Sequence, residues 1–402
     1  MDAGKVYQKT SALLEEYLED LGMAVPAGPL RAMGELTRGI VRTGSVQLTN
    51  AARLFADTPA HLAHAVKRIS EHLLDDGWSH QSWAAAVLAE QVRHIEADSL
   101  IPIDATELAK PYAKHMQYQC IIRDASRPGD PLLPGYWCWG AYQWQAEQDI
   151  LAPLMLRPYS TRQPHFLSEN DQWRRYLRAL CQATGGKGIW LHDRGADRPE
   201  IFSELLDLKV RWIVRVREDR PLIGPNGSTG PAGVWADWAL LHQPERGHAV
   251  TCPVRLAGLP ARPFRGQEQL WLVVPTYRFA NGDRWVLLTC GLIDQRVGPR
   301  QVRHDYALRW RAEDGKRFLG QLWHVERFLT RSFVALERML HCAVAAGGFL
   351  AMLQRDWPEL AQLLQAEVVY WNKPVKVPGY RLARGIIGAA MQHGPLPVLV
   401  NA

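Results

Sequence analysis

Residues 188–199 read GIWLHDRGADRP, a short apolar run that is followed by the acid Asp193. A similar run, LIPIDAT at 100–106, contains the acid Asp104. Runs of this length and composition are typical of buried strands. An acid at the end of such a strand is exposed at the edge of a sheet, where ligand sites form. A single Asp there is most often a turn or helix cap, whereas two on one α/β core favour a shared site.

The segments around these two runs alternate between strand and helix patterns. Strand patterns at 135–145 and 149–160 precede a helical pattern at 168–184, which begins with a Ser cap. The run at 188–199 comes next, and the helical pattern EIFSELLDL follows it. This order of three strands, a helix, a strand and a helix indicates a mixed α/β sheet.

The chain beyond this sheet first turns β-rich and then helical. Between 209 and about 291, apolar runs that include WADWALLHQ at 235–243 are separated by Gly- and Pro-rich turns. We expect strands and no helix in this block. From 300 to 354 the pattern is helical again, and the tail from 355 predicts a short helix and Pro-rich loops.

The first 98 residues carry apolar side chains at helical spacing, which predicts an all-α region. Two breaks, Thr43-Gly44-Ser45 and Asp57-Thr58-Pro59, are plausible turns of a helix-turn-helix. An ordinary helical bundle explains the same pattern, and both interpretations stay open.

The charge of the chain points to a polyanionic partner. The 402 residues include 47 Lys and Arg and 41 Asp and Glu, which gives a formal charge of +6 and a pI near 9.0. Acids exceed bases in the first hundred residues, so the positive excess lies in the remaining body, which is typical of some nucleic-acid-binding proteins. The 47% apolar and 22% charged composition excludes wholesale disorder.

Membrane and disulfide-rich classes are disfavoured. No run of about 18 uncharged apolar residues occurs, so we expect no membrane span, and the acidic N-terminus does not resemble a secretory signal. Six cysteines lie far apart without a CxxC pair, which argues against a zinc site and predicts a cytoplasmic protein. The 16 tryptophans are core residues for the most part, but Trp is also a stacking platform for bases.

A third acid, Glu313, completes a possible metal site. Tyr306, Arg309 and Glu313 are spaced i, i+3 and i+7, so we expect them on one face of a helix over 300–321. A solvated face or an i,i+4 ion pair is the alternative. Three carboxylates suit Mg²⁺ or Mn²⁺ and can hold two ions about 4 Å apart. Arg309 would then neutralise phosphate charge, and Tyr306 would donate to a phosphate oxygen.

Taken in order, these motifs resemble those of bacterial insertion-sequence transposases of the DDE class. The similarity is strongest to the insertion-sequence-four family, to which the Tn-five transposase belongs, and it spans about residues 100–350. Three motifs carry it: Ile103-Asp104-Ala105-Thr106, Asp193-Arg194-Gly195-Ala196-Asp197, and Tyr306-x2-Arg309-Trp310-Arg311-x-Glu313. The resemblance implies that Asp104, Asp193 and Glu313 are the catalytic and metal-binding acids, with Mg²⁺ or Mn²⁺ as two ions per site.

The resemblance also implies an α/β fold with a ribonuclease-H-like catalytic core, a β-rich insertion, an N-terminal all-α domain and a C-terminal helical region. The corresponding boundaries are 1–99 for DNA-end binding, 100–208 and 292–354 for the core, 209–291 for the insertion and 355–402 for possible dimerisation. The implied partners are double-stranded DNA, as transposon terminal inverted repeats and target DNA, and a second subunit in a homodimeric synaptic complex. A cytoplasmic protein at the bacterial nucleoid, without a membrane, is implied as well.

Two further positions refine this resemblance. Trp285, in RWVLLT at 284–289, matches a family Trp that stacks on a flipped base of a hairpin intermediate, although a core Trp is the alternative. The family signature ends in a Lys where this chain has Gly320, and Lys316 or Arg317 could approach the same phosphate. We expect Asp197 to be a supporting residue, and Asp314 to be a weaker candidate ligand than Glu313.

The leading hypothesis is a cut-and-paste DNA transposase that acts through a hairpin. The alternatives are a metal-dependent DNA nuclease with the same fold and a domesticated, non-catalytic DNA-binding protein or transposition inhibitor. Further candidate DNA contacts are basic residues chosen by charge and register: Arg194, Arg38, Arg42, Arg53, Lys67 and Arg68.

Overall fold

The computed structural model describes residues 2–22, 27–125, 127–145, 150–243, 248–260, 270–277, 283–293, 297–366, 368 and 379–394. The chain divides into two compact units. Unit 1 comprises Met1–Arg93, Ala105–Phe166 and Glu313–Ala402, and unit 2 comprises His94–Asp104 and Leu167–Ala312. Strand β1 (Leu100–Ala109) contributes its first residues to unit 2 and its last residues to unit 1.

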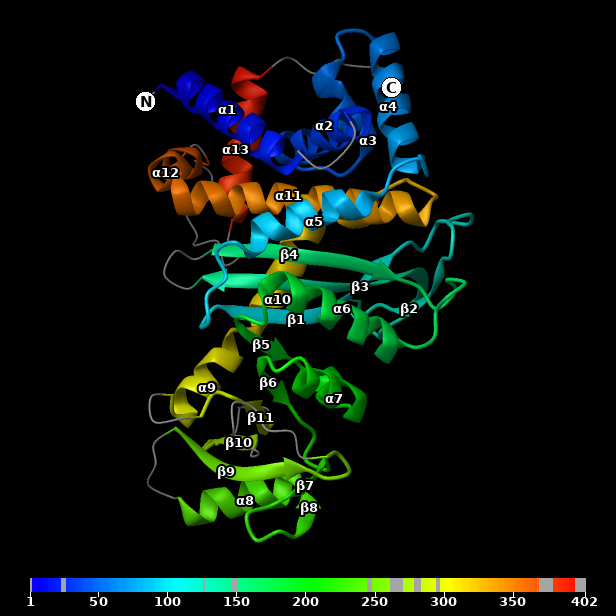
Figure 1. The fold of residues 1–402 in the computed structure, drawn as a ribbon. Coiled ribbons are helices and arrows are strands. Elements are labelled where there is room, and N and C mark those ends of the chain that lie inside the picture. Colours follow the sequence, from blue (N-terminus) through cyan, green and yellow to red (C-terminus); the bar gives the residue numbers. More distant parts are fainter. Residues whose placement is uncertain are drawn as a thin grey trace. The chain divides into compact units, whose positions relative to one another are not determined.

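Unit 1 begins with helices, as the apolar spacing predicts (Figure 1). Its first five are α1 (Ala3–Gly22), α2 (Ala27–Thr43), α3 (Leu48–Ala52), α4 (Pro59–Leu74) and α5 (His80–Val92). Both predicted turns lie between helices: α2 ends at Thr43, where Gly44 adopts a φ of +66°, and the Thr58 hydroxyl caps α4 by accepting from the His61 amide at 3.2 Å.

The later helices of unit 1 include its central element. They are α11 (Phe333–Asp356), α12 (Pro358–Ala366) and α13 (Tyr380–His393). Helix α11 packs against α2, α4, α5, α12 and β4 (Ile150–Tyr159), and 17 of its 24 residues are buried. By length and composition α11 could cross a membrane, but 83% of its apolar window is buried inside the protein, as in a core helix. The lack of a side chain at Gly348 lets α11 pack closely against α5, because a Cβ at this position would lie 1.8 Å from the side-chain nitrogen of Gln91.

The strands of unit 1 form an antiparallel group. Strand β3 (Leu132–Gln145) pairs with β2 (Cys120–Arg123) and with β4, and the β3–β4 register shifts between Ala141 and Tyr142. The α5 and α11 helices pack on β4 (Figure 1). Both strand patterns predicted before residue 160 are therefore confirmed.

Unit 2 contains a mixed sheet with helices. Its helices are α6 (Glu169–Thr184), α7 (Pro199–Asp207), α8 (Ala232–His242) and α9 (Pro299–Ala307). Its strands after β1 are β5 (Ile189–His192), β6 (Arg211–Arg215), β7 (Pro221–Ile223), β8 (Thr229–Pro231), β9 (Ala249–Leu256), β10 (Leu270–Pro275) and β11 (Leu287–Cys290). Strand β5 runs parallel to β1 and β6, whereas the pairs β6–β11, β11–β10, β10–β9, β9–β7 and β7–β8 are antiparallel.

Helix α8 corrects the expectation that the β-rich block contains no helix. The run WADWALLHQ was expected to be a strand, but Ala232–His242 is helical. Its five buried residues are spaced i, i+1, i+3, i+4 and i+7, as on the inner face of a helix packed on β9 and β10: Ala232, Gly233, Trp235, Ala236 and Ala239. Apolar residues on both faces of a short helix imitate the pattern of a buried strand.

The single helix expected over 300–321 is also wrong. Helix α9 ends at Ala307, a 3₁₀ turn follows at Leu308–Trp310, and α10 (Arg311–Arg317) leads into a π-helical turn at Phe318–Leu322. A 3₁₀ residue advances the side-chain direction by about 120° instead of 100°. The i, i+3, i+7 argument for one shared face therefore does not hold across this segment.

All six cysteines are unpaired, as the spacing predicts, and only Cys181 is not buried. Burial raises the pKa of the Cys138, Cys290 and Cys342 thiols to about 12 and that of Cys252 to about 11. Burial also raises the pKa of Cys181.

Arg338 on α11 fastens the α4–α5 connection to the core of unit 1. Its side chain is 2% exposed, and its guanidinium donates to the carbonyls of Leu73 at 2.8 Å, His72 at 3.1 Å and Trp78 at 3.1 Å. The guanidinium also lies over the Trp78 ring, 4.4 Å from its centroid. A buried cation thus satisfies carbonyls at the end of α4 that no helical amide reaches.

Replacing Arg338 with Leu should lower the free energy of unfolding by about 2–4 kcal/mol, because two carbonyls in buried hydrogen bonds and one in a partly buried hydrogen bond lose their charged donor. Urea unfolding followed by circular dichroism measures the change. The exposed Arg331 provides the matched control, Arg331→Leu, which should shift stability by less than about 0.5 kcal/mol. Equal effects of the two variants would contradict the role given to Arg338.

Glu337 lies in a partly buried group of titratable and charged side chains from α5, α11 and β4. Its Oε2 is 3.7 Å from His80 Nε2, the His80 ring stacks on His341, and Arg157 and Arg338 face the same carboxyl. Burial outweighs the two arginines and raises the pKa of Glu337 to about 7. Burial lowers the pKa of both imidazoles, to about 3 for His341.

Glu337 should make the folded state less stable as pH rises from about 4.5 to about 7. In this window the folded protein keeps a proton that the unfolded chain, with its ordinary pKa of 4.5, has released. Urea midpoints at pH 5 and pH 8 should therefore fall more in the parent than in Glu337→Gln. The exposed Glu359 gives the control variant Glu359→Gln, whose pH dependence should equal the parent's. Parallel profiles for all three proteins would refute this.

Candidate active site

Asp104 lies on β1, and Asp193 lies at the equivalent position directly after the neighbouring parallel strand β5 of unit 2. Ile103 on β1 pairs with His192 on β5, and the two acids are the next residues. Neighbouring strands lie about 4.8 Å apart, so the two carboxylates start from adjacent backbone positions. Asp193 follows β5 as predicted, but β1 continues to Ala109 beyond Asp104.

The local backbone around Asp193 forms a tight turn. The Asp193 carboxylate caps a 3₁₀ turn at Arg194–Ala196 by accepting from the Gly195 amide at 2.8 Å. His192, immediately before it, is fully buried, and burial lowers its pKa to about 3 against the opposing charge of Asp104. The imidazole behind the two acids is therefore neutral, and it adds no positive charge to the site.

Arg309 brings a cation to Asp104. Its Nη1 donates to Asp104 Oδ2 at 3.1 Å, and the two side chains are only 10% and 12% exposed. The Arg309 guanidinium also lies over the exposed Trp310 ring, 5.0 Å from its centroid. A charge-assisted bond of this kind holds one carboxylate in a fixed direction and offsets its charge.

Tyr306 joins the same cluster from α9. It is 4% exposed, and burial raises the pKa of its hydroxyl, with Arg309 and Arg215 opposing and Asp193 and Asp104 adding to the rise. The hydroxyl therefore stays protonated and can donate a hydrogen bond. Its ring packs edge-on against the half-buried Trp285, with ring centroids 5.0 Å apart.

Glu313 and its basic neighbours lie in unit 1. Lys316 Nζ is 3.5 Å from Glu313 Oε1, and the two side chains are 18% and 34% exposed, while Arg317 is exposed. Because Asp104 and Asp193 belong to unit 2, the full catalytic triad stays a prediction. Across the part of the chain that the structure describes, no group of three or more His, Cys, Asp or Glu side chains could hold a metal ion.

A small cavity of about 50 Å³ lies beside Lys316 in unit 1. Gly320, which stands where the family signature has Lys, lines it together with Lys316, Glu107 and Glu326. Burial raises the pKa of both Glu107 and Glu326. A Cβ at Gly320 would meet no atom within 4 Å, so the position has room for a side chain.

Asp197 is a structural residue, in agreement with the sequence analysis. Its side chain is fully buried, and Oδ2 accepts from the Arg217 amide at 2.8 Å and from Arg217 Nε at 3.2 Å. Arg220, itself buried, donates from Nε to Oδ1 and from Nη2 to the Asp197 carbonyl at 2.6 Å. These bonds fasten the turn after Asp193 to the segment that follows β6.

The basic residues predicted to contact DNA in the N-terminal helices have partners within unit 1. Arg38 forms hydrogen bonds with Glu15, and Arg68 pairs with the buried Glu35 at 2.6 Å. Arg53 donates to Asn50 at 3.1 Å. Lys67, 71% exposed, forms a long 3.8 Å pair with Glu71. Their DNA contacts stay predictions, and Lys67 is the best exposed of them.

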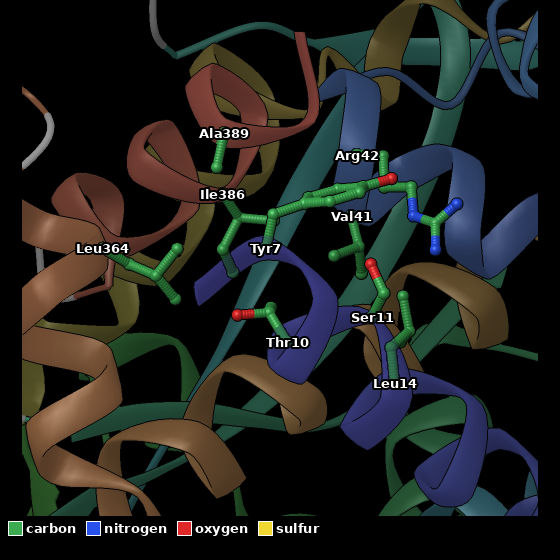
Figure 2. Close-up of a pocket in the computed structure, with 9 residues that line it drawn as sticks. All are labelled: Tyr7, Thr10, Ser11, Leu14, Val41, Arg42, Leu364, Ile386 and Ala389. Carbon is green, nitrogen blue, oxygen red and sulfur yellow. The ribbon is translucent and has the colours of Figure 1, made fainter. Parts of the chain in front are cut away.

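Arg42 lies at the edge of a small apolar cavity. Figure 2 shows the Tyr7 ring extending toward Arg42, with Val41 and Leu14 below the ring and Ala389 of α13 above it. The guanidinium is 5.8 Å from the Tyr7 ring centroid and 3.9 Å from Glu15 Oε1. The cavity holds about 10 Å³, the space of about one water molecule, which is too small for an organic ligand.

Sequence reasoning missed three charged residues around Trp285. Arg215 on β6 binds both carboxylate oxygens of Asp283, at 2.7 and 2.6 Å, and Arg284 is buried beside Trp285. The adjacent letters Asp283-Arg284 were the available signal. Their partners depend on the β6–β11 pairing, which no local pattern specifies.

The comparisons with known proteins bear on this geometry. Residues 167–346 match the model of one protein family. That family is described as "Transposase DDE domain". The matched span includes Asp193, Glu313 and the β-rich block and excludes Asp104. The DDE match supports a DDE transposase, whereas membership in the insertion-sequence-four family and similarity to the Tn-five transposase receive no support from it.

Two other comparisons add less than the DDE match. A solved piggyBac transposase synaptic complex with hairpin DNA is similar over 98% of this chain and 72% of that chain, with 11% identity and a TM-score of 0.46. A likeness this weak carries no argument about function. No curated protein matches the chain.

Asp197→Ala should lower the free energy of unfolding by about 3–5 kcal/mol, because the buried Arg220 loses its counter-charge. Asp219 also pairs with Arg217, at 3.7 Å, but it is 81% exposed. The matched control Asp219→Ala should therefore change stability by less than about 1 kcal/mol. Thermal and urea unfolding measure both variants, and a mild effect of Asp197→Ala would speak against its structural role.

Proposed function

We propose that this protein is a cut-and-paste DNA transposase of the DDE class. The observation that carries the proposal is the placement of Asp104 and Asp193 at adjacent positions on parallel strands, with Asp193 inside a span that matches the transposase DDE domain. In this proposal Glu313 is the third acid, and the sheet is the core of a ribonuclease-H-like fold. The protein would belong to the insertion-sequence-four family, whose motifs its sequence resembles.

The two carboxylates have the chemistry that divalent cations require. Carboxylate oxygens are hard donors suited to Mg²⁺ or Mn²⁺, the two acids stand next to each other, and the neighbouring His192 imidazole has a lowered pKa and is neutral. Asp104, Asp193 and Glu313 would hold two ions, which when bound would lower the pKa of a water and stabilise the leaving oxygen.

The remaining side chains would bind and orient the DNA end. Arg309 is placed to exchange its bond with Asp104 for a bond with a phosphate oxygen, and Tyr306 keeps its proton and can donate it. Trp285 would stack on a base extruded from the duplex. Arg194, exposed beside Asp193, would contact the backbone of the DNA.

The reaction would proceed by successive displacements at phosphorus. Water would first release a 3′-hydroxyl at the transposon end, and this hydroxyl would attack the opposite strand to form a hairpin. A second water would reopen the hairpin, and the 3′-hydroxyl would then join target DNA. In this proposal hairpin formation would also require Trp285, whereas the other steps would not.

The rest of the chain would supply end recognition and assembly in a cytoplasmic, nucleoid-associated homodimer. Residues 1–99 would bind the inverted repeats, and 209–291 would be the insertion between the core parts 100–208 and 292–354. The dimerisation region 355–402 includes α12 and α13, and the basic residues Lys373 and Lys376 lie outside the described residues. Phosphate contacts by the basic residues, among them Lys316 and Arg317, would each steepen the salt dependence of binding by about one unit.

Asp193→Ala should reduce Mg²⁺-dependent nicking of labelled transposon-end DNA by about 10³-fold or more, since several kcal/mol of transition-state stabilisation is lost. Denaturing gels of reactions with Mg²⁺, Mn²⁺ or EDTA measure the nicking. Asp98, exposed in the same unit, provides the control Asp98→Ala, which should nick as the parent does.

Each alternative gives a different gel. A parent that never nicks, or nicking that survives Asp193→Ala, would refute the enzyme and favour a non-catalytic DNA-binding protein. Nicking without strand transfer into target DNA would favour a metal-dependent nuclease.

A further inference from the structure

Trp285 is flanked by two residues that ion pairs fasten to other elements. On one side, Asp283 accepts from Arg215 Nη2 at 2.7 and 2.6 Å. On the other side, Arg284 donates to Glu218 from Nε at 3.3 Å and from Nη2 at 2.7 Å, and to Asp237 from Nη1. The strand-like bond from the Val216 amide to the Val286 carbonyl, at 2.8 Å, continues this fastening. The backbone on both sides of Trp285 is therefore fixed.

The partners of Arg284 come from two separate parts of unit 2. Glu218 follows β6, and Asp237 lies on α8, which packs on β9 and β10. The Arg284 side chain is 5% exposed, whereas Glu218 and Asp237 are 52% and 69% exposed. A planar guanidinium that binds two carboxylates at once has a single favourable orientation. Because Asp237 lies on α8, its bond with Arg284 links α8 to the backbone next to Trp285 and helps to fix the direction of the chain there.

Trp285 is itself half-buried, and its ring is in edge-to-face contact with a second aromatic ring. It contacts Tyr306 at 5.0 Å between centroids, with an interplanar angle of 82°. Stacking of a base on an aromatic ring contributes about 1–3 kcal/mol. Much of that gain is lost if the ring has to be ordered when the base arrives, because immobilising a side chain costs entropy. A ring fixed in advance avoids this loss.

We propose that Arg284, with Glu218 and Asp237, is a positioning clamp that holds Trp285 ready to stack on an unpaired DNA base. The proposal rests on the proposed function for its substrate. It adds three residues that lie outside the three motifs, and it gives α8 a role in handling the base. Arg284 acts through Trp285 and touches no DNA.

The exposure of the two acids makes the role testable without unfolding the protein. Removing Arg284 leaves both carboxylates in contact with water, so no buried charge is stranded. Asp237→Asn changes one exposed side chain on α8 and weakens the clamp without altering Arg284. Arg284→Lys keeps the charge but cannot bind both carboxylates in one plane.

The experiment uses hairpin DNA with 2-aminopurine at the base next to the hairpin tip, in EDTA. The parent should increase the 2-aminopurine fluorescence several-fold or quench it by stacking, because the base leaves its stack. Arg284→Leu should lose this change at least fivefold, Asp237→Asn about twofold, and Arg284→Lys an intermediate amount. The exposed Arg255 on β9 gives the control Arg255→Leu, which should respond as the parent does. Circular dichroism checks that each variant is folded.

A parallel reaction with Mg²⁺ separates this inference from the proposed function. Arg284→Leu should nick linear end DNA within about twofold of the parent and form hairpins at least fivefold less. An equal fall of nicking and hairpin formation would overturn the clamp, as would a parental 2-aminopurine signal in Arg284→Leu or no signal in the parent. Absence of nicking by the parent would instead refute the transposase, while the signal in EDTA still tests the clamp.

Discussion

The parallel pairing of β1 with β5 is the constraint on which the candidate site depends. Because Ile103 and His192 are in register, the residues after them must stand side by side. Two carboxylates that start about 5 Å apart repel each other, and the repulsion grows as water is excluded. The structure offsets it with the cation of Arg309 on Asp104 and with an amide hydrogen bond on Asp193. The strand register thus brings the two carboxylates together, and the hydrogen bonds from Arg309 and from the Gly195 amide offset their repulsion.

Around these acids, unit 2 contains two sets of ion pairs, one at the acids themselves and one further along the chain. The first set is the hydrogen-bonded pair of Asp104 and Arg309. Both charges act on the Tyr306 hydroxyl, and the Tyr306 ring contacts Trp285. The second set pairs arginines with acids from separate segments of the chain. Asp197, for example, pairs with both Arg217 and Arg220. Arginine suits this arrangement because its charge is permanent and its fork binds two acceptors in fixed directions. The turns that carry functional side chains are therefore fastened by side chains that have other positions in the sequence.

Local sequence patterns predicted where most helices and strands lie, but not where a helix is interrupted or which side chains form ion pairs. The helices before residue 98, the Ser168 cap of α6 and the strands β1, β3, β4, β5 and β6 follow from periodicity and capping, which depend on neighbours in the chain, whereas β2 was not predicted. Helix α8 and the 3₁₀ turn at Leu308–Trp310 do not, because packing on β9 and β10 and local winding override a short apolar pattern. The choice of Asp283 for Arg215 depends on which strands pair, and that of Asp237 for Arg284 depends on how α8 packs, and no local sequence pattern specifies either.

The cysteine pattern has a practical consequence. Five of the six thiols are buried, and four of these have a raised pKa, so they are both inaccessible and largely protonated at neutral pH. Cys181, near the end of α6, is the only one of the six thiols that is not buried, so it is the most accessible to a maleimide reagent, although burial raises its pKa as well. With Cys181 replaced by Ser, one new surface cysteine could carry a fluorophore at a chosen place. The native chain is therefore close to a single-label background for following DNA-dependent movement by energy transfer.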